Sequence, residues 1–154
     1  MRSVLLWTIL IAVIAGAAAA RDESLDELKS RAKNAPLQDR PGPCIHIAEL
    51  QLRNADKLYR DGDAELGRAA VEDIVAYSQQ AGDAALTTKK HIKNVEIAVR
   101  KMAERLRDVK RTLAFEDQPA VEHAVQRLEE IRTSLLKGMF GKDKDKEKEE
   151  QPKK

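Results

Sequence analysis

The sequence predicts an all-α fold, an elongated antiparallel bundle of four main helices with a short helix before it and a disordered charged tail after it. The 154 residues are 35% charged and 42% hydrophobic but only 3% aromatic, a composition typical of helical proteins. Apolar residues recur at steps of three and four along several stretches, which is the period of an amphipathic helix. Gly, Pro and Asp stand between these stretches, where one helix ends and the next begins. We expect the bundle itself over residues 44–140.

Residues 1–20 have the layout of a secretion signal peptide. Arg2 precedes an apolar run over residues 4–14, and the small residues Ala18, Ala19 and Ala20 form the expected cleavage site, as is typical of such signals. We predict cleavage before Arg21 and an extracytoplasmic protein, periplasmic or secreted, with no transmembrane span in the mature chain. An uncleaved membrane anchor is the alternative, although the apolar run is short for a span of about 20 residues.

A short helix is predicted over residues 21–34. Ser24 and Glu27 lie three residues apart, as in a capping box, where each side chain binds a backbone N–H group at the helix start. Three prolines then make residues 35–43 a linker. The last of them, Pro43, suits the first turn of the next helix because its missing N–H group has no partner there.

The second and third helices are predicted over residues 44–61 and 63–81. Gly62 ends the second helix because glycine adopts the left-handed conformation of a helix C-terminus without strain. Asp63 is a favourable N-cap, and so short a connection makes the two helices antiparallel. The expected core positions are Ile45, Ala48, Leu52, Ala55 and Tyr59 in the second helix, and Leu66, Ala70, Val71, Ile74, Val75, Tyr77 and Ser78 in the third.

The hairpin of these two helices, over residues 48–80, has a characteristic set of small and apolar positions, namely Ala55, Leu58, Gly62, Asp63, Gly67 and Val71. In these positions the hairpin resembles one tetratricopeptide unit. It departs from the family pattern at Gln51, where the family has a large apolar residue, and at Gln79, where it has a proline. The resemblance covers one repeat length and implies a hairpin used in peptide or protein interaction.

The longest predicted helix covers residues 84–115, which include neither Gly nor Pro. Its apolar residues alternate steps of three and four over three heptads, the pattern of a coiled-coil seam. Because this helix is longer than its neighbours, we expect an elongated molecule with one thin end that could accept a partner or a second copy. The apolar seam consists of Ile92, Val95, Val99, Met102, Leu106, Val109 and Leu113.

The last helix is predicted to begin near Pro119, which suits a first helical turn, and to end at Gly138. The tail over residues 141–154 alternates Lys with Asp or Glu and has no aliphatic residue. Since no apolar burial would offset the entropy of ordering it, we predict that the tail is disordered. The expected core positions of the last helix are Val121, Ala124, Leu128, Ile131 and Leu135.

The helix predicted over residues 84–115 is also strongly basic, with nine Lys and Arg against three acids. Many of these bases fall opposite the apolar seam. The interpretation that we favour is that acids of the neighbouring helices compensate this charge within the molecule. In the alternative interpretation, this outer face binds an anionic polymer or a lipid head group. The candidate anion-binding residues are Lys90, Lys93, Arg100, Arg107 and Arg111, and the candidate internal partners on the third helix are Glu65, Glu72 and Asp73.

Cys44 is the one cysteine in the sequence, so no internal disulfide can form. A small buried core residue is the interpretation that we favour, and a bridge between two chains is the alternative. A homodimer through Cys44 or through the apolar seam therefore stays open.

No residues have the spacing of a catalytic or metal centre. The three histidines, His46, His91 and His123, are expected on three different helices. Cys44 and His46 are two residues apart and would point to nearly opposite sides of a helix, so they cannot chelate one ion.

We therefore predict no cofactor, no metal and no enzymatic activity. The expected function is that of an exported non-catalytic helical protein that contacts another protein or a cell-envelope component. Anion binding at the basic face and peptide binding at the 48–80 hairpin are the alternatives. Nucleic acid is disfavoured, because the mature chain is nearly neutral and no aromatic residues are interspersed among its bases.

Overall fold

The computed structural model describes the backbone of residues 24–149 and the side chains of residues 24–141. The predicted signal peptide, residues 1–20, and the last five residues of the chain lie outside the described residues. The described part is helical throughout apart from short connections, which confirms the predicted all-α class. Its helices are α1 (Leu25–Asn34), α2 (Pro41–Asp61), α3 (Ala64–Thr88), α4 (Ile92–Thr112) and α5 (Gln118–Glu149).

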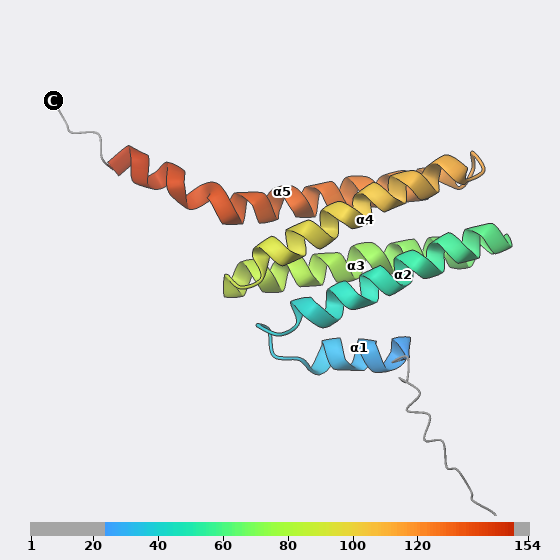
Figure 1. Ribbon diagram of the computed structural model, residues 1–154, viewed down its shortest axis with the longest axis horizontal. Coiled ribbons are helices and arrows are strands. Elements are labelled where there is room, and N and C mark those ends of the chain that lie inside the picture. The colour runs from blue at the N-terminus through green and yellow to red at the C-terminus, as the bar shows by residue number, and fades with distance from the viewer. Residues whose placement is uncertain (1–23, 150–154) are drawn as a thin grey trace, which may run out of the picture.

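Two antiparallel hairpins form the bundle, α2 with α3 and α4 with α5 (Figure 1). The hairpins pack together mainly through α3, which contacts both α4 and α5, while α2 contacts α4. The short helix α1 lies on the outside, against α2. The stacked hairpins give the elongated shape that the sequence predicted. Among the described helices, none combines the length and the hydropathy that a membrane span requires.

Local signals determine the ends of the first helices. The Ser24 hydroxyl accepts a hydrogen bond from the Glu27 N–H at 3.2 Å, and the Glu27 carboxylate accepts one from the Ser24 N–H at 3.0 Å, which confirms the capping box. Gly62 ends α2 as predicted, with a φ of 87°. The helix α2 begins earlier than predicted, at Pro41, because a proline needs no N–H partner in a first turn. Asp63 precedes α3, but its side chain makes no capping hydrogen bond.

The predicted helix over residues 84–115 is wrong in its extent, because the chain turns within it. The helix α3 continues through Gly82 to Thr88, and α4 begins only at Ile92. Gly82 is buried where α3 approaches α5, and a Cβ atom on it would lie 3.2 Å from Cγ2 of Ile131. Glycine here allows two helices to approach closely instead of ending a helix.

The turn between α3 and α4 forms without glycine. The Thr88 hydroxyl donates a hydrogen bond to the Ala84 carbonyl at 2.8 Å and accepts one from the Lys90 N–H at 3.4 Å. Such side-chain bonds compete with the helical backbone pattern. Lys89 and His91 then adopt φ values of 58° and 61°, a left-handed conformation that costs non-glycine residues about 1–3 kcal/mol each. Packing of the two hairpins must therefore offset this strain.

The apolar seam along α4 is confirmed. Its five central residues are buried, and Ile92 and Leu113 at its two ends are half-buried. It packs against α5, where every predicted core position is also buried. The buried residues of the two helices include Val95, Val99, Met102, Leu106 and Val109 of α4, and Val121, Ala124, Leu128, Ile131 and Leu135 of α5.

The inward faces of α2 and α3 are displaced by one residue from several predicted positions. Leu66, which the sequence placed in the core, is 58% exposed. Its neighbour Gly67 is buried instead, against the ring of Tyr59. On α2, the buried Gln51 donates a hydrogen bond to Asp73 of α3 at 2.6 Å. A polar contact between the two helices thus replaces the apolar residue of a tetratricopeptide unit.

The helix α5 continues past its predicted end. Gly138 lies inside the helix and does not end it. Its missing side chain makes room for Leu86 of α3, because a Cβ atom on Gly138 would clash with Cδ2 of Leu86. The sequence predicts disorder from Gly141 onwards, whereas the described backbone is helical to Glu149, in keeping with the favourable helix propensities of Lys and Glu. Figure 1 shows this last part of α5 extending beyond the other helices.

Candidate functional site

Three of the five basic residues predicted to bind an anion take part in ion pairs. The Arg107 guanidinium donates a hydrogen bond to Glu129 of α5 at 2.7 Å. Arg100 and Arg111 pair with acids of α4 itself, at 3.3 Å and 3.0 Å. Much of the positive charge of α4 is therefore compensated inside the molecule. The acids that pair with Arg100, Arg107 and Arg111 belong to α4 and α5, and not to α3 as the sequence suggested.

Lys90 and Lys93 lie apart from these pairs. Lys90 is in the turn between α3 and α4, where its ammonium group donates a hydrogen bond to Gln38 at 3.1 Å. Lys93 is exposed in the first turn of α4. The five basic residues therefore do not all lie on one helix. Anion binding by them stays a prediction.

An ion-pair network crosses from α4 to α5 beside the apolar seam. Glu96 is only 8% exposed and accepts a hydrogen bond from the Arg132 guanidinium at 2.9 Å. Arg132 also reaches Glu129, at 3.4 Å, which joins this pair to Arg107. The hydrogen bond from Arg107, aided by that from Arg132, holds the pKa of Glu129 below its ordinary value, although partial burial opposes the shift. Electrostatic pairing thus supports the same helix contact as the apolar seam.

We expect the Glu129→Gln variant to lose less stability than the parent on acidification. A carboxylate whose pKa is lower in the folded state contributes stability above its unfolded pKa, and this contribution disappears as the pH falls through the folded pKa. The unfolded value is about 4.3, so the difference should appear below about pH 5. Melting temperatures between pH 7 and pH 3 measure it. The control is Glu130→Gln, because Glu130 pairs within α5, with Arg127. Identical pH profiles for the two variants would contradict the role of Glu129.

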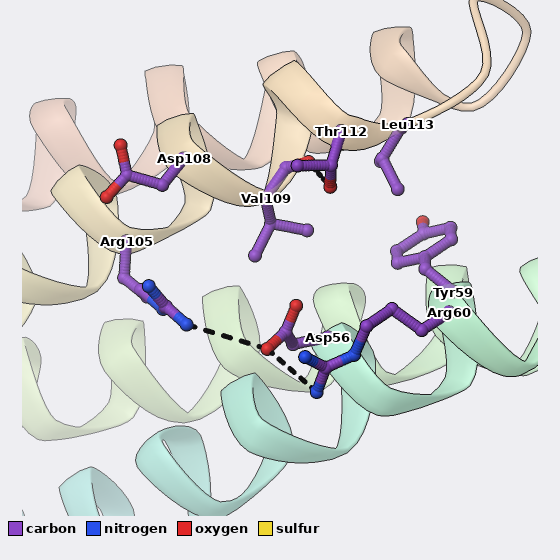
Figure 2. Close-up of a pocket in the computed structure, with 8 residues that line it drawn as sticks. All are labelled: Asp56, Tyr59, Arg60, Arg105, Asp108, Val109, Thr112 and Leu113. Atoms are coloured by element: carbon purple, nitrogen blue, oxygen red, sulfur yellow. Dashed lines mark hydrogen bonds and ion pairs between the residues drawn. The ribbon is translucent and has the colours of Figure 1, made fainter.

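A pocket of about 320 Å³ lies where the C-terminal parts of α2 and α4 face each other (Figure 2). The Asp56 carboxylate pairs there with Arg60 of α2 at 3.2 Å and with Arg105 of α4 at 3.6 Å. Asp108 supplies a second acid, and Val109 points toward the pocket from α4. Because two acids balance two bases, this pocket carries no net charge for a ligand to neutralise.

Tyr59 lines the same pocket, and its hydroxyl group is buried without a hydrogen-bond partner among the described residues. Burial, together with the nearby carboxylate of Asp117, raises the pKa of Tyr59. A phenol that stays protonated at neutral pH can donate a hydrogen bond. The pocket contains no histidine or cysteine, so it offers no activated nucleophile of the usual Ser–His or Cys–His kind.

A larger hollow, of about 700 Å³, lies on the α2–α3 hairpin and is formed by that hairpin alone. This α2–α3 groove is lined by the part of α2 from Gln51 to Asp61 and by the following part of the chain from Asp63 to Asp73. Leu66 borders it with an exposed side chain. The charged residues that line the groove are Asp61, Asp63, Glu72, Asp73 and Lys57.

This groove could not be predicted from the sequence, because the apolar periodicity of α3 assigns Leu66 to the core. The signal that could have corrected the assignment is Gly67, which together with Ala70, Val71 and Ile74 forms the buried stripe. Because Gly67 lies against Tyr59 of α2, Leu66 beside it lies on the outer side of α3. Periodicity alone does not show which of two adjacent stripes is covered.

The remaining candidate ligands lie apart. The three histidines are exposed, on α2, in the turn before α4 and on α5. Within the described residues, no three His, Cys, Asp or Glu side chains are arranged to hold a metal ion. Cys44 is completely buried, and burial raises the pKa of its thiol. This confirms the interpretation of Cys44 as a small core residue, and a bridge between chains through it would require the core to open.

Comparison with known protein families, with curated proteins and with solved structures finds no match to this chain. The tetratricopeptide-like features of residues 48–80 therefore remain a resemblance in the hairpin alone.

Proposed function

We propose that this chain is an exported, non-catalytic helical protein that acts by contact with another protein or a component of the cell envelope. Export is inferred from the charged start, the apolar run and the alanines of residues 1–20. The contact surface that we propose is the α2–α3 groove.

The observation that carries the proposal is the exposure of Leu66 at the edge of this groove. An isolated exposed leucine is ordinary on a protein surface. Leu66 differs because it borders a hollow of about 700 Å³. Three acids of the groove, Asp61, Asp63 and Glu72, also have no ion-pair partner among the described residues. An apolar surface with a polar rim is typical of a protein interaction site.

The other two candidate sites are less open to a partner. The basic residues of α4 are largely engaged with acids of α4 and α5. In the pocket between α2 and α4, Arg60 and Arg105 are already engaged by Asp56. A partner at either site would have to break existing pairs, whereas Asp61, Asp63 and Glu72 of the α2–α3 groove have no ion-pair partner among the described residues.

Site-specific photo-crosslinking in the native host tests this proposal. A photoreactive phenylalanine analogue at Leu66 should give a discrete crosslinked product, because that side chain would lie against the partner. The same analogue at Lys101, an exposed residue of α4, is the control and should give none. Equal products at both positions, or no product at Leu66, would reject the groove as the contact surface.

A further inference from the structure

The packing of α1 on the α2–α3 hairpin indicates which kind of segment the α2–α3 groove binds. Its Leu28 and Ala32 are 1% and 2% exposed, so the apolar side of this short helix is fully used in packing. Its Lys29 reaches across to α3 and pairs with Asp73 at 2.9 Å. The α2–α3 hairpin therefore already holds one helix on this side, through small and aliphatic residues flanked by a lysine–aspartate pair.

The groove begins beside the N-terminal half of α1. Asp73, which pairs with Lys29 of α1, also lines the groove. From there the lining residues of the groove continue toward Gly62. Figure 1 shows that α2 and α3 extend beyond α1 on this side. The apolar residues of this uncovered part are the half-buried Leu58 and the exposed Leu66 and Ala69. The packing surface under α1 thus continues beyond the start of that helix.

The charges of the uncovered part favour a basic occupant. Asp61, Asp63 and Glu72 carry three negative charges without an ion-pair partner among the described residues, and Lys57 supplies one positive charge. By contrast, Glu96 of α4 and Glu129 of α5, which lie at the contact between these two helices, are both paired with arginines. A partner with lysine or arginine beside its apolar residues would extend the pairing that Lys29 begins.

We propose that the α2–α3 groove binds a basic amphipathic helix of a partner protein, lying end to end with α1. This proposal rests on the proposed function and names the chemistry of its partner. The stretch of α2 from Gln51 to Asp61 corresponds to about 15 Å at 1.5 Å per residue, so the occupant has about three turns. Its apolar residues recur at steps of three and four, with Lys or Arg on both sides, as in other helix-in-groove complexes.

The segment of this chain that precedes α1 is a less suitable occupant. Residues 4–20 are apolar and contain no charged residue, so they cannot pair with the acids of the groove. A second copy of the chain is the other alternative, and the experiment below includes it as an outcome.

The test uses a synthetic amphipathic peptide of about 14 residues, with leucines at steps of three and four and lysines on the flanks. A matched peptide has every lysine replaced by glutamate. Fluorescence anisotropy with the purified protein at low salt should show saturable binding of the lysine peptide and at least about tenfold weaker binding of the glutamate peptide, since like charges repel across an interface.

Two double variants locate the binding site. Asp61→Lys with Glu72→Lys should weaken binding of the lysine peptide by at least about tenfold. Glu104→Lys with Asp108→Lys reverses two exposed acids of α4 and should leave the affinity unchanged. Circular dichroism verifies that each variant is folded. A further variant, Leu66→Asp, changes the net charge in the opposite direction and should still weaken binding, because it removes the apolar contact. A change in net charge could not explain both losses.

Several outcomes would overturn the proposal. These are no saturable binding of the lysine peptide up to about 1 mM, equal binding of the two peptides, or equal affinities of the two double variants. A concentration-dependent dimer that Leu66→Asp abolishes would assign the groove to a second copy instead. Crosslinking at Leu66 without peptide binding would reject the basic helix and leave the proposed function standing. Peptide binding without crosslinking in the host would reject the groove as the contact surface in the host and would still show that the groove binds a basic helix.

Discussion

Replacement of Leu106 by alanine should lower the free energy of unfolding by about 2–5 kcal/mol. Leu106 is completely buried on the face of α4 that packs against α5. Alanine would leave a cavity that the neighbouring side chains fill only in part, so the lost burial and the lost contacts add. Urea unfolding followed by circular dichroism measures the change, provided that the slope of the transition stays constant.

The matched control is the same substitution at Leu66, which is 58% exposed on α3. A surface substitution of this kind changes stability by about 0.5 kcal/mol or less. A difference of at least about 1.5 kcal/mol between the two variants would agree with the register of the apolar seam. Equal losses at the two leucines would show that α4 faces α5 in a different register.

Replacement of Gly82 by leucine should cost about 1–3 kcal/mol, because the added side chain has no room. A Cβ atom on Gly82 would already lie 3.2 Å from Cγ2 of Ile131, and the remaining atoms of leucine would push α3 away from α5. Inside a helix, leucine is more favourable than glycine by about 0.8 kcal/mol. The expected loss from overpacking exceeds this gain. Thermal unfolding compared with the parent protein measures the net effect.

Gly141→Leu is the control for this substitution, because nothing lies within 4 Å of a Cβ atom on Gly141. The same gain in helix propensity applies there, without the overpacking. We expect the Gly141→Leu variant to melt at or above the temperature of the parent. If Gly82→Leu also stabilised the protein, the close approach of α3 to α5 at Gly82 would be wrong.

The sequence was most informative where the signal lies within one or two turns of the chain. The capping box of Ser24 and Glu27 and the left-handed Gly62 have local causes, and both are present in the structure. The seam around Leu106 was also predictable, since an a/d stripe on a helix with few other apolar residues leaves one face to bury.

The same reasoning failed at glycines. Gly62 ends a helix, whereas Gly82 and Gly138 lie within helices that pack closely, against Ile131 and Leu86 respectively. All three look alike in the sequence as glycines near the end of an apolar pattern. The difference depends on which helix lies opposite, and this is a property of the tertiary structure.

The candidate sites depended on tertiary structure more than the helices did. Arg107 was identified from the sequence as a basic surface residue, but only the packing of α5 places Glu129 at 2.7 Å from it. Leu66 was assigned to the core, and only the burial of the neighbouring Gly67 against Tyr59 turns it outward.

By itself, the sequence determined the helical class, the start of α1, the end of α2 and the buried seams of α4 and α5. These features follow from capping hydrogen bonds and from the helical repeat, which act within about four residues along the chain. Only the tertiary structure decided where α3 ends, which charges are paired and that a groove lies on the α2–α3 hairpin. Those features depend on contacts between residues that are far apart in the sequence. Examples are the close approach of Gly82 to Ile131 and the pairing of Asp73 with Lys29, which join different helices.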